Sequence, residues 1–246
     1  MDIREILEAF GTGKIDVSEA ERRLRTDYIE AIGSDVLLDP GRQIRKGVPE
    51  VVFARGKTPE TVAEILRSSE ERILVSGAGP EHFEAVRNLK NIQTMEDCGC
   101  IVYGGFPEEK YGPVAFVTAG TSDIPVAREA VLMARMMGCA CLEYYDVGVA
   151  GLHRILKPMK EIIEKDAAAI VVAAGMEGAL PTIVSSLSPV PVIGVPVSSG
   201  YGFGGGGTGA LIGMLQSCSP GLSVVNIDNG IGAGAAAGLI AAGRSR

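Results

Sequence analysis

The sequence predicts an α/β protein whose second half is a parallel sheet with helices packed on both of its faces. Two observations carry this prediction. From residue 110 onward, short apolar runs alternate in a regular rhythm with segments of helical periodicity. The apolar runs are also continuous instead of alternating with polar residues, which is typical of parallel strands that are buried on both faces.

The elements of this half follow one another in a simple order. The expected strands lie at 114–118, 140–145, 167–173, 191–195 and 222–226. The expected helices lie at 124–137, 152–164, 178–187, 208–217 and 231–243. We therefore expect residues 110–246 to form a doubly wound, flavodoxin-like domain of three layers.

Residues 1–109 carry a less regular pattern and are expected to form a small N-terminal α+β region. Apolar residues at positions 3, 6, 7 and 10 mark one face of a short helix, and Asp16 with Glu19 fits the capping box of a second helix. Two such helices cannot form a core alone, so we expect them to dock on the main domain or on another subunit. Strands are then expected at 35–39, 50–54, 72–76, 92–95 and 100–103, with helices from Thr58-Pro59 and over 81–90.

Composition and charge narrow the class of protein. The 246-residue chain has a net charge of −7 and a pI of about 5.0, so we expect no nucleic-acid partner. The first ten residues mix charged and apolar side chains, unlike a signal peptide, and apolar segments stay well short of the ~20 residues that cross a membrane. Five cysteines, an odd number, do not suggest a disulfide framework. We therefore expect a cytoplasmic protein.

Two loops that follow predicted strands carry side chains suited to an anionic ligand. The first strand ends in TAGTSD at 118–123, where Thr121, Ser122 and Asp123 precede a helix whose N-terminal N–H groups favour negative charge. The alternative is that Ser122 or Asp123 only caps this helix. The second strand leads through a loop to His153 and Arg154, which are either ligand contacts or a surface cap.

The stretch from 173 to 220 is expected to hold the centre of the site. A strand ends at Gly175, and Met176 and the acid Glu177 follow before the next helix. Further on, GYGFGGGGTG at 200–209 has seven glycines in ten residues and lacks the Lys-[Ser/Thr] ending of a P-loop. A flexible linker is one explanation. The other is a backbone wall that closes against a ligand, formed by Gly204, Gly205, Gly206 and Gly207.

Cys218 is the candidate reactive thiol, because it lies in a polar loop after the helix at 208–217. Most single cysteines are nevertheless inert. Cys139 and Cys141 enter an apolar strand and are predicted to be core residues. The pairs Cys98/Cys100 and Cys139/Cys141 have C-x-C spacing, which does not match the usual zinc pattern.

Several of these motifs together resemble the LarB family, pyridinium-3,5-biscarboxylic acid mononucleotide synthase, whose members begin the assembly of the nickel-pincer cofactor. The motifs are TAGTSD at 118–123, His153-Arg154 and, from residue 173 onward, AAGMEGALP, PVIGVPV and GGGGTGALIGMLQSCSPGLSVVNIDNGIGAGAAAG. The segment DPGRQIRKGVPEVVFARGKTPE at 39–60 also looks like the N-terminal region of that family. The resemblance therefore covers nearly the whole chain.

The second half is also similar to the PurE family of aminoimidazole ribonucleotide carboxylases and mutases, which shares the PVIGVPV strand. The AHLPG segment of PurE carries a histidine where this chain has Ala179 before Leu180-Pro181. Glu177 stands two residues earlier, and Cys218 lies where PurE has no matching catalytic thiol. These differences favour the resemblance to LarB.

The resemblance to LarB implies an enzyme that carboxylates nicotinic acid adenine dinucleotide with CO2 or bicarbonate and hydrolyses it to release AMP. It implies Cys218 as a transient nucleophile and Glu177 as the acid/base. Thr121, Ser122 and Asp123 would hold phosphate, ribose or a magnesium ion. Mg²⁺ is the expected cofactor, because it offsets the charge of a diphosphate, and Asp123 is its candidate ligand.

Two other interpretations stay open from the sequence: a purine-pathway carboxylase or mutase, and a non-catalytic nucleotide-binding module. PurE relatives are octamers, so a homo-oligomer is expected by analogy. The Gly/Ala-rich segment at 230–243 would suit close helix contacts at a subunit interface or a tightly packed internal helix.

Overall fold

The computed structural model describes residues 3–26, 30–32, 36–38, 42 and 46–245. In the C-terminal half, five strands of the described chain form one parallel sheet in the order β11-β10-β9-β7-β8. Their bounds are β7 (Tyr111–Thr118), β8 (Cys139–Tyr144), β9 (Ala169–Ala174), β10 (Val192–Pro196) and β11 (Leu222–Val224). This is the strand order of flavodoxin-like domains, and the predicted fold class is confirmed.

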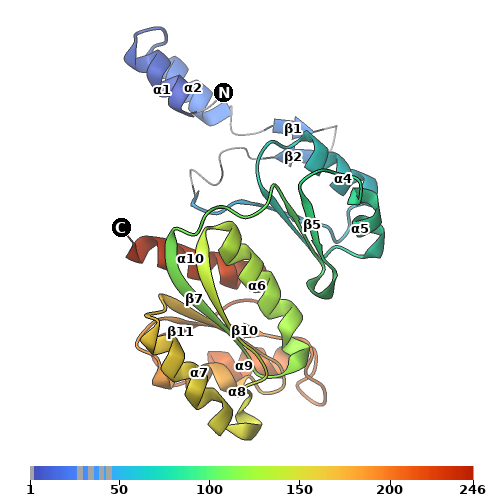
Figure 1. Ribbon diagram of the computed structural model, residues 1–246, viewed down its shortest axis with the longest axis vertical. Coiled ribbons are helices and arrows are strands. Elements are labelled where there is room, and N and C mark those ends of the chain that lie inside the picture. Colours follow the sequence, from blue (N-terminus) through green and yellow to red (C-terminus); the bar gives the residue numbers. More distant parts are fainter. Residues whose placement is uncertain (1–2, 27–29, 33–35, 39–41, 43–45, 246) are drawn as a thin grey trace.

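Helices cover both faces of this sheet (Figure 1). Their bounds are α6 (Ile124–Met136), α7 (His153–Glu164), α8 (Ala179–Leu187), α9 (Thr208–Leu215) and α10 (Gly230–Arg244). Helices α6 and α10 pack on the face that carries Val114 and Phe116, whereas α7, α8 and α9 pack on the face that carries Ala115 and Val117. Neighbouring side chains of β7 therefore enter two different cores, which explains why its apolar run is continuous.

Each strand and helix predicted for this half is present, and only the ends differ. Strand β7 begins at Tyr111, three residues earlier than predicted, because it pairs there with Cys139 before a shift of register. Helix α9 ends at Leu215, two residues earlier than predicted. Helix α10 extends the predicted range by one residue at each end.

The N-terminal region contains a second, mixed sheet in the order β3-β4-β6-β5. The bounds are β3 (Glu50–Phe53), β4 (Ile73–Ser76), β5 (Ile92–Met95), β6 (Cys100–Tyr103), α4 (Pro59–Ser68) and α5 (Pro80–Val86). Helix α4 begins as predicted, since Thr58 Oγ1 accepts a hydrogen bond from the Thr61 N–H. Helix α5 ends at Val86, four residues earlier than predicted, and the chain turns into β5 through Asn91 at a φ of 60°.

The first described elements form a helical hairpin and a short strand pair. Their bounds are α1 (Ile3–Gly11), α2 (Val17–Thr26), β1 (Glu30–Ile32) and β2 (Val36–Leu38). The predicted cap of α2 is present, since Asp16 Oδ1 accepts a hydrogen bond from the Glu19 N–H. Ile6 and Ala20 are buried in the hairpin, which stands apart from both sheets (Figure 1). Docking of this hairpin on another subunit stays a prediction.

The two sheets are joined through α6. Leu74 and Val102 of the N-terminal sheet share a core with Met133 of α6. The Ser76 hydroxyl donates a hydrogen bond of 2.8 Å to Glu129 Oε1, and Arg128 forms an ion pair with Asp97. The N-terminal region is thus held directly against the helix that follows the first strand of the parallel sheet.

Helix α10 packs closely on α6 through a row of glycines four residues apart. A Cβ atom at Gly230 would lie 2.2 Å from the Val126 carbonyl oxygen, and one at Gly234 would lie 2.3 Å from the Ala130 carbonyl oxygen. The Gly/Ala-rich segment is therefore a tightly packed internal helix, one of the two explanations that its composition allowed. No helix in the described part of the chain is both long and apolar enough to cross a membrane.

Candidate functional site

The candidate site lies at the carboxyl edge of the parallel sheet, where β7 and β9 are neighbours. The chain leaves β7 and connects to β8 on one side, whereas β9 and later strands lie on the other side. Such a reversal of strand order opens a crevice at the carboxyl ends of the strands. Two predicted segments meet there: the 3₁₀ helix Thr121–Asp123 after β7, and the turn at 175–178 after β9.

Asp123 is the buried carboxylate of this edge and is only 3% exposed. Its Oδ1 accepts a hydrogen bond of 2.8 Å from the Ser199 hydroxyl, and its Oδ2 accepts one of 2.9 Å from the Gly120 N–H. Burial raises the pKa of Asp123 above its ordinary value, and these hydrogen bonds oppose the rise. Thr121 and Ser122 beside it are exposed to solvent.

Glycines let the segments after β9 and β10 approach one another. A Cβ at Gly175 would lie 2.6 Å from the Ser199 hydroxyl oxygen, and a Cβ at Gly200 would lie 2.7 Å from the Met176 nitrogen. Met176 itself has a φ of 50°, an uncommon conformation for a residue with a side chain. The ends of β9 and β10 therefore form one continuous backbone surface beside Asp123.

The glycine loop at 200–207 is a folded turn of the structure. The Gly206 N–H donates a hydrogen bond to the Gly200 carbonyl, and the Gly209 N–H donates one to the Gly204 carbonyl. A Cβ at Gly209 would lie 3.1 Å from the Met176 carbonyl oxygen, so the loop also packs against the turn after β9. The loop connects a buried strand to α9, and its hydrogen bonds do not match the flexible linker that composition alone allowed. Gly204 and Gly205 are half-buried, Gly206 is exposed and Gly207 is buried.

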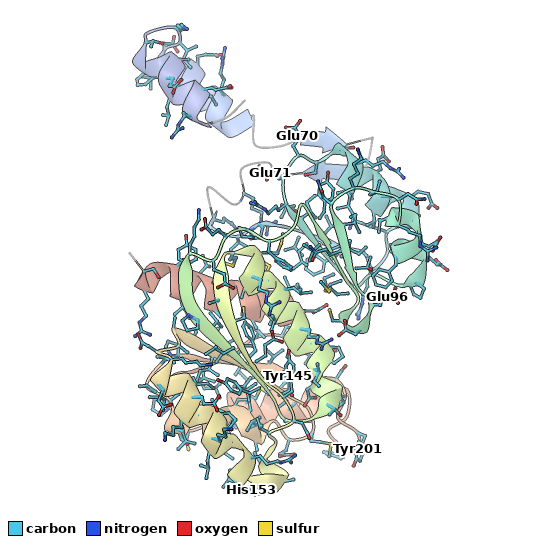
Figure 2. All side chains as sticks on the ribbon, viewed as in Figure 1. Glu70, Glu71, Glu96, Tyr145, His153 and Tyr201 are labelled. Atoms are coloured by element: carbon cyan, nitrogen blue, oxygen red, sulfur yellow. The ribbon has the colours of Figure 1, made fainter. Side chains whose placement is uncertain are left out.

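Glu177 is exposed at the same edge. Its backbone is fixed by α9, because its carbonyl oxygen would lie 2.1 Å from a Cβ at Gly213. His153 and Arg154 follow β8 in the chain. His153 lies at the same end of the domain as Tyr201 of the glycine loop (Figure 2). His153 is exposed, and Arg154 Nη1 lies 3.3 Å from Asp146 Oδ2.

Cys218 lies at the opposite edge of the sheet. It follows α9, which runs back from the carboxyl edge, and it comes just before Gly221, whose carbonyl accepts a hydrogen bond from the first residue of β10. The five residues of β10 separate the two edges by ~13 Å. The thiol is exposed there, beside the serine cluster Ser185, Ser217 and Ser219. Within one chain, the structure does not bring Cys218 next to Asp123.

Cys139 and Cys141 fit structural roles. Burial raises the pKa of Cys139 to about 11 and that of Cys141 to about 12, so both stay neutral thiols. Cys139 is buried in the core, as predicted, and Cys141 is half-buried against it. Within the described residues, no group of three or more His, Cys, Asp and Glu side chains could hold a metal ion. Asp123 with neighbouring hydroxyls therefore fits Mg²⁺ only where substrate phosphates complete the coordination shell.

Ser199 is a site residue that the sequence analysis missed. It comes three residues after β10, at the carboxyl edge, and its hydroxyl holds a carboxylate 76 positions away in the sequence. Its position after a buried strand could have indicated a site residue. Its partner could not have been predicted from local sequence, because only the pairing of β7, β9 and β10 brings the two residues together.

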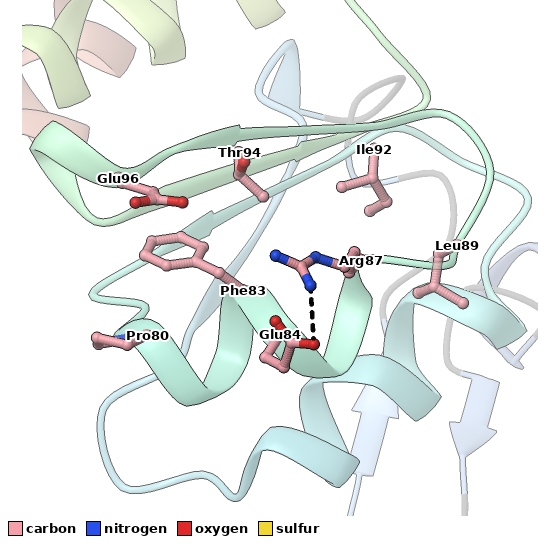
Figure 3. A pocket seen from close by; sticks show the side chains of 8 residues that line it. All are labelled: Pro80, Phe83, Glu84, Arg87, Leu89, Ile92, Thr94 and Glu96. Carbon is pink, nitrogen blue, oxygen red and sulfur yellow. Dashed lines mark hydrogen bonds and ion pairs between the residues drawn. The ribbon is translucent and has the colours of Figure 1, made fainter.

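A cavity of about 360 Å³ lies elsewhere, in the N-terminal region between α5 and β5 (Figure 3). Its lining residues are Pro80, Phe83, Glu84, Arg87, Leu89, Ile92, Thr94 and Glu96. Arg87 forms an ion pair of 3.2 Å with Glu84 at its rim. None of the residues predicted for the site lines this cavity, so it is separate from the site at the carboxyl edge.

Comparisons with known proteins cover nearly the whole chain. Residues 113–245 match the family model described as AIR carboxylase, and residues 29–104 match the LarB/PurE-like N-terminal domain. An uncharacterized protein of Methanocaldococcus jannaschii is 43% identical over 251 residues, which cover 98% of this chain and 97% of that protein. The N5-carboxyaminoimidazole ribonucleotide mutase of the same organism is 32% identical over 120 residues, 48% of this chain and 71% of the mutase. The mutase of Pyrococcus horikoshii is 31% identical over 90 residues, 35% of this chain and 49% of the mutase.

Proposed function

The chain belongs to the LarB/PurE-like family, and from this premise we propose that it carboxylates the pyridinium ring of nicotinic acid adenine dinucleotide. In the same proposal it hydrolyses the phosphoanhydride, releasing AMP and pyridinium-3,5-biscarboxylic acid mononucleotide for the nickel-pincer cofactor. The observation that carries the proposal is the presence, in one chain, of a LarB/PurE-like N-terminal domain and an AIR carboxylase domain. Membership of this family supports a carboxylase-type enzyme, without specifying the substrate.

The chemistry explains why a thiol is needed. A pyridinium ring is electron-poor and does not attack CO2. A thiolate that adds to the ring carbon para to nitrogen converts the ring into a dienamine, whose meta carbon is nucleophilic. That carbon forms the new bond to CO2, a base then removes its proton, and expulsion of the thiolate restores the aromatic ring. Covalent catalysis of this kind divides one difficult step into several accessible ones.

The residues of the carboxyl edge take the remaining roles in this proposal. Glu177 is exposed beside the glycine loop and removes the ring proton. Asp123, held by Ser199 and Gly120, and the hydroxyls of Thr121 and Ser122 orient the ribose and diphosphate. When bound, Mg²⁺ would neutralise the diphosphate charge at Asp123.

The position of Cys218 adds a condition to the proposal. Since α9 carries the thiol away from the carboxyl edge of its own sheet, we propose that the attacking sulfur comes from a second copy of the chain. Ile212 and Leu215 lie exposed on α9 just before Cys218, at 57% and 64%. An apolar surface around an exposed thiol suits contact between copies, and enzymes of this size are commonly symmetric oligomers.

The test is a product assay by mass spectrometry. Wild-type protein incubated with nicotinic acid adenine dinucleotide, bicarbonate and Mg²⁺ should yield AMP and the dicarboxylated mononucleotide. Cys218→Ala should lower carboxylation by at least ~1,000-fold, whereas Cys98→Ala, which removes a thiol of the N-terminal region, should retain it. Glu177→Gln should bind substrate and turn over ~100-fold more slowly or worse. Full carboxylation by Cys218→Ala would refute the covalent mechanism.

A second candidate function is that of the aminoimidazole ribonucleotide mutases, which the 32% identity over 120 residues favours. The resemblance to PurE places Ala179 where that family has a histidine, which argues against this activity. Conversion of N5-carboxyaminoimidazole ribonucleotide by the wild-type protein, with no product from nicotinic acid adenine dinucleotide, would establish it.

A further inference from the structure

The glycine loop at the candidate site presents two aromatic side chains to solvent. Phe203 is fully exposed and Tyr201 is 79% exposed. Both are flanked by glycines, since the segment reads Gly200-Tyr-Gly-Phe-Gly204. Met176, on the turn against which the loop packs, is also 47% exposed.

Exposure of two whole rings is unfavourable unless something covers them. An aromatic side chain buries 150–250 Å² when it finds a partner, at roughly 25 cal/mol for each Å² of apolar surface. The loop does not need the rings for its own fold, because backbone hydrogen bonds close it, such as those from Gly206 to Gly200 and from Gly209 to Gly204. The rings are therefore available to a ligand or partner.

The position of the loop at the carboxyl edge and its lack of charged side chains indicate which kind of ligand it can bind. The loop packs on the turn after β9, and Ser199, which precedes it, holds the buried Asp123. Residues 200–209 carry no charged side chain, so the loop offers ring faces and backbone N–H groups to a ligand. Apart from its chain neighbours, a Cβ at Gly202 or at Gly206 would meet no atom of the described residues within 4 Å, so both positions of the loop face open space.

We propose that Tyr201 and Phe203 form an aromatic platform that stacks on a planar nitrogen heterocycle of a nucleotide bound at the carboxyl edge. The identity of that nucleotide, a pyridinium–adenine dinucleotide, rests on the proposed function. Its two rings share the chemistry that the platform recognises: each is flat and offers a π face on which an aromatic side chain can stack. The platform gives affinity for the ring, while the polar residues of the edge hold the ribose and phosphate.

The first experiment measures binding in the absence of bicarbonate. Stacking on one aromatic side chain contributes ~1–3 kcal/mol, so Tyr201→Ala and Phe203→Ala should each raise the Kd of nicotinic acid adenine dinucleotide by about fivefold or more. Phe53→Ala is the matched control, because Phe53 is an exposed ring on the N-terminal sheet. It should leave the Kd unchanged. Unchanged affinity in both loop variants would overturn the platform.

The second experiment identifies the ring. The chain contains no tryptophan, so Phe203→Trp creates a single fluorescent reporter on the loop. Saturable quenching by nicotinic acid mononucleotide assigns the pyridinium ring to the platform, and quenching by AMP assigns adenine. Quenching by neither mononucleotide nor by the dinucleotide would contradict stacking.

The third measurement separates a ligand from a subunit contact. If Tyr201→Ala and Phe203→Ala dissociate the protein in light scattering while nucleotide affinity per site is unchanged, the rings belong to an interface and the proposal is wrong. The light-scattering and binding measurements do not depend on turnover. If the loop variants lose binding and the wild type gives no carboxylated product, the platform stands and the proposed reaction is rejected.

Discussion

Glu129 is a half-buried carboxylate that connects the two halves of the molecule. Its Oε1 accepts the hydrogen bond from Ser76, and its side chain lies beside Gly230 at the start of α10. Burial raises the pKa of Glu129, the Ser76 hydrogen bond and the charge of Arg55 oppose the rise, and the charge of Asp228 adds to it. The surroundings of Glu129 therefore favour its neutral form over its charged form.

This burial predicts a specific dependence of stability on pH. A raised pKa means that folded protein retains the Glu129 proton to a higher pH than unfolded protein. The stabilising contribution is present below the ordinary glutamate pKa of 4.5 and is lost as the pH rises through the raised value. The free energy of unfolding of Glu129→Gln, relative to wild type, should therefore increase from pH 4.5 towards neutrality.

Urea denaturation at several pH values measures this difference. Gln retains an oxygen that accepts the hydrogen bond from Ser76, so the variant keeps the contact between the two halves. Glu60→Gln, a change at an exposed position of α4, serves as the control and should give a profile parallel to that of the wild type. A parallel profile for Glu129→Gln would refute the prediction.

The position of a site residue could be predicted from the sequence where that residue directly follows a strand. Asp123 and Gly175 follow apolar strands, so both had to lie at the carboxyl edge. The same rule, applied to Cys218, places it at the amino edge, because it follows a helix and precedes a strand. The polar loop that predicts Cys218 as the reactive thiol says nothing about the edge at which it lies. The contact of Ser199 with Asp123 needed the pairing of strands and could not be read from local patterns.

At the scale of elements, α10 shows how a row of glycines sets the distance between two helices. Gly230, Gly234 and Gly238 face α6, where the Ala130 carbonyl oxygen lies only 2.3 Å from the place of a Cβ at Gly234. That oxygen belongs to the backbone of a neighbouring helix and cannot rotate away. The composition of the segment predicted close packing, and the structure identifies α6 as the partner.

Gly234→Ala should therefore destabilise the protein, although alanine favours a helix more than glycine does. The overpacking costs about 1–3 kcal/mol, which exceeds the gain in helix propensity. Gly243→Ala is the matched control in the same helix, because its methyl group would meet no other atom of the described residues within 4 Å. It should be neutral or stabilising by up to ~1 kcal/mol. Thermal unfolding of both variants decides the matter, and equal melting temperatures would contradict the packing argument.

Most elements were predictable because their patterns are local. Continuous apolar runs identified the parallel strands, and Thr58-Pro59 and Asp16 identified helix starts. Strand β1 was missed, since three residues give too short a pattern. The end of α5 was misplaced because Asn91 adopts a left-handed conformation that the sequence permits but does not require.

At the scale of the whole molecule, the acid and the thiol of the proposed reaction lie at different edges of the parallel sheet. Glu177 and the glycine loop lie at the carboxyl edge of the sheet, and Cys218 lies at the amino edge. Helix α9 runs from the glycine loop towards Cys218, and its Gly213 is fixed against the backbone of Glu177. The thiol is exposed beyond the end of this helix. Two copies of the chain can bring the thiol of one to the carboxyl edge of the other.

Mixed oligomers test this arrangement directly. Cys218→Ala and Glu177→Gln alone should each keep about a hundredth of wild-type activity or less, because every site would lack either the thiol or the acid. If each site takes Glu177 from one chain and Cys218 from its neighbour, chains mixed in equal amounts, dissociated and reassembled, should regain about a quarter of wild-type activity. Reassembly of either variant with itself is the control and should stay at that level. If both groups came from the same chain, each mixed oligomer would contain only defective sites, and no activity would return.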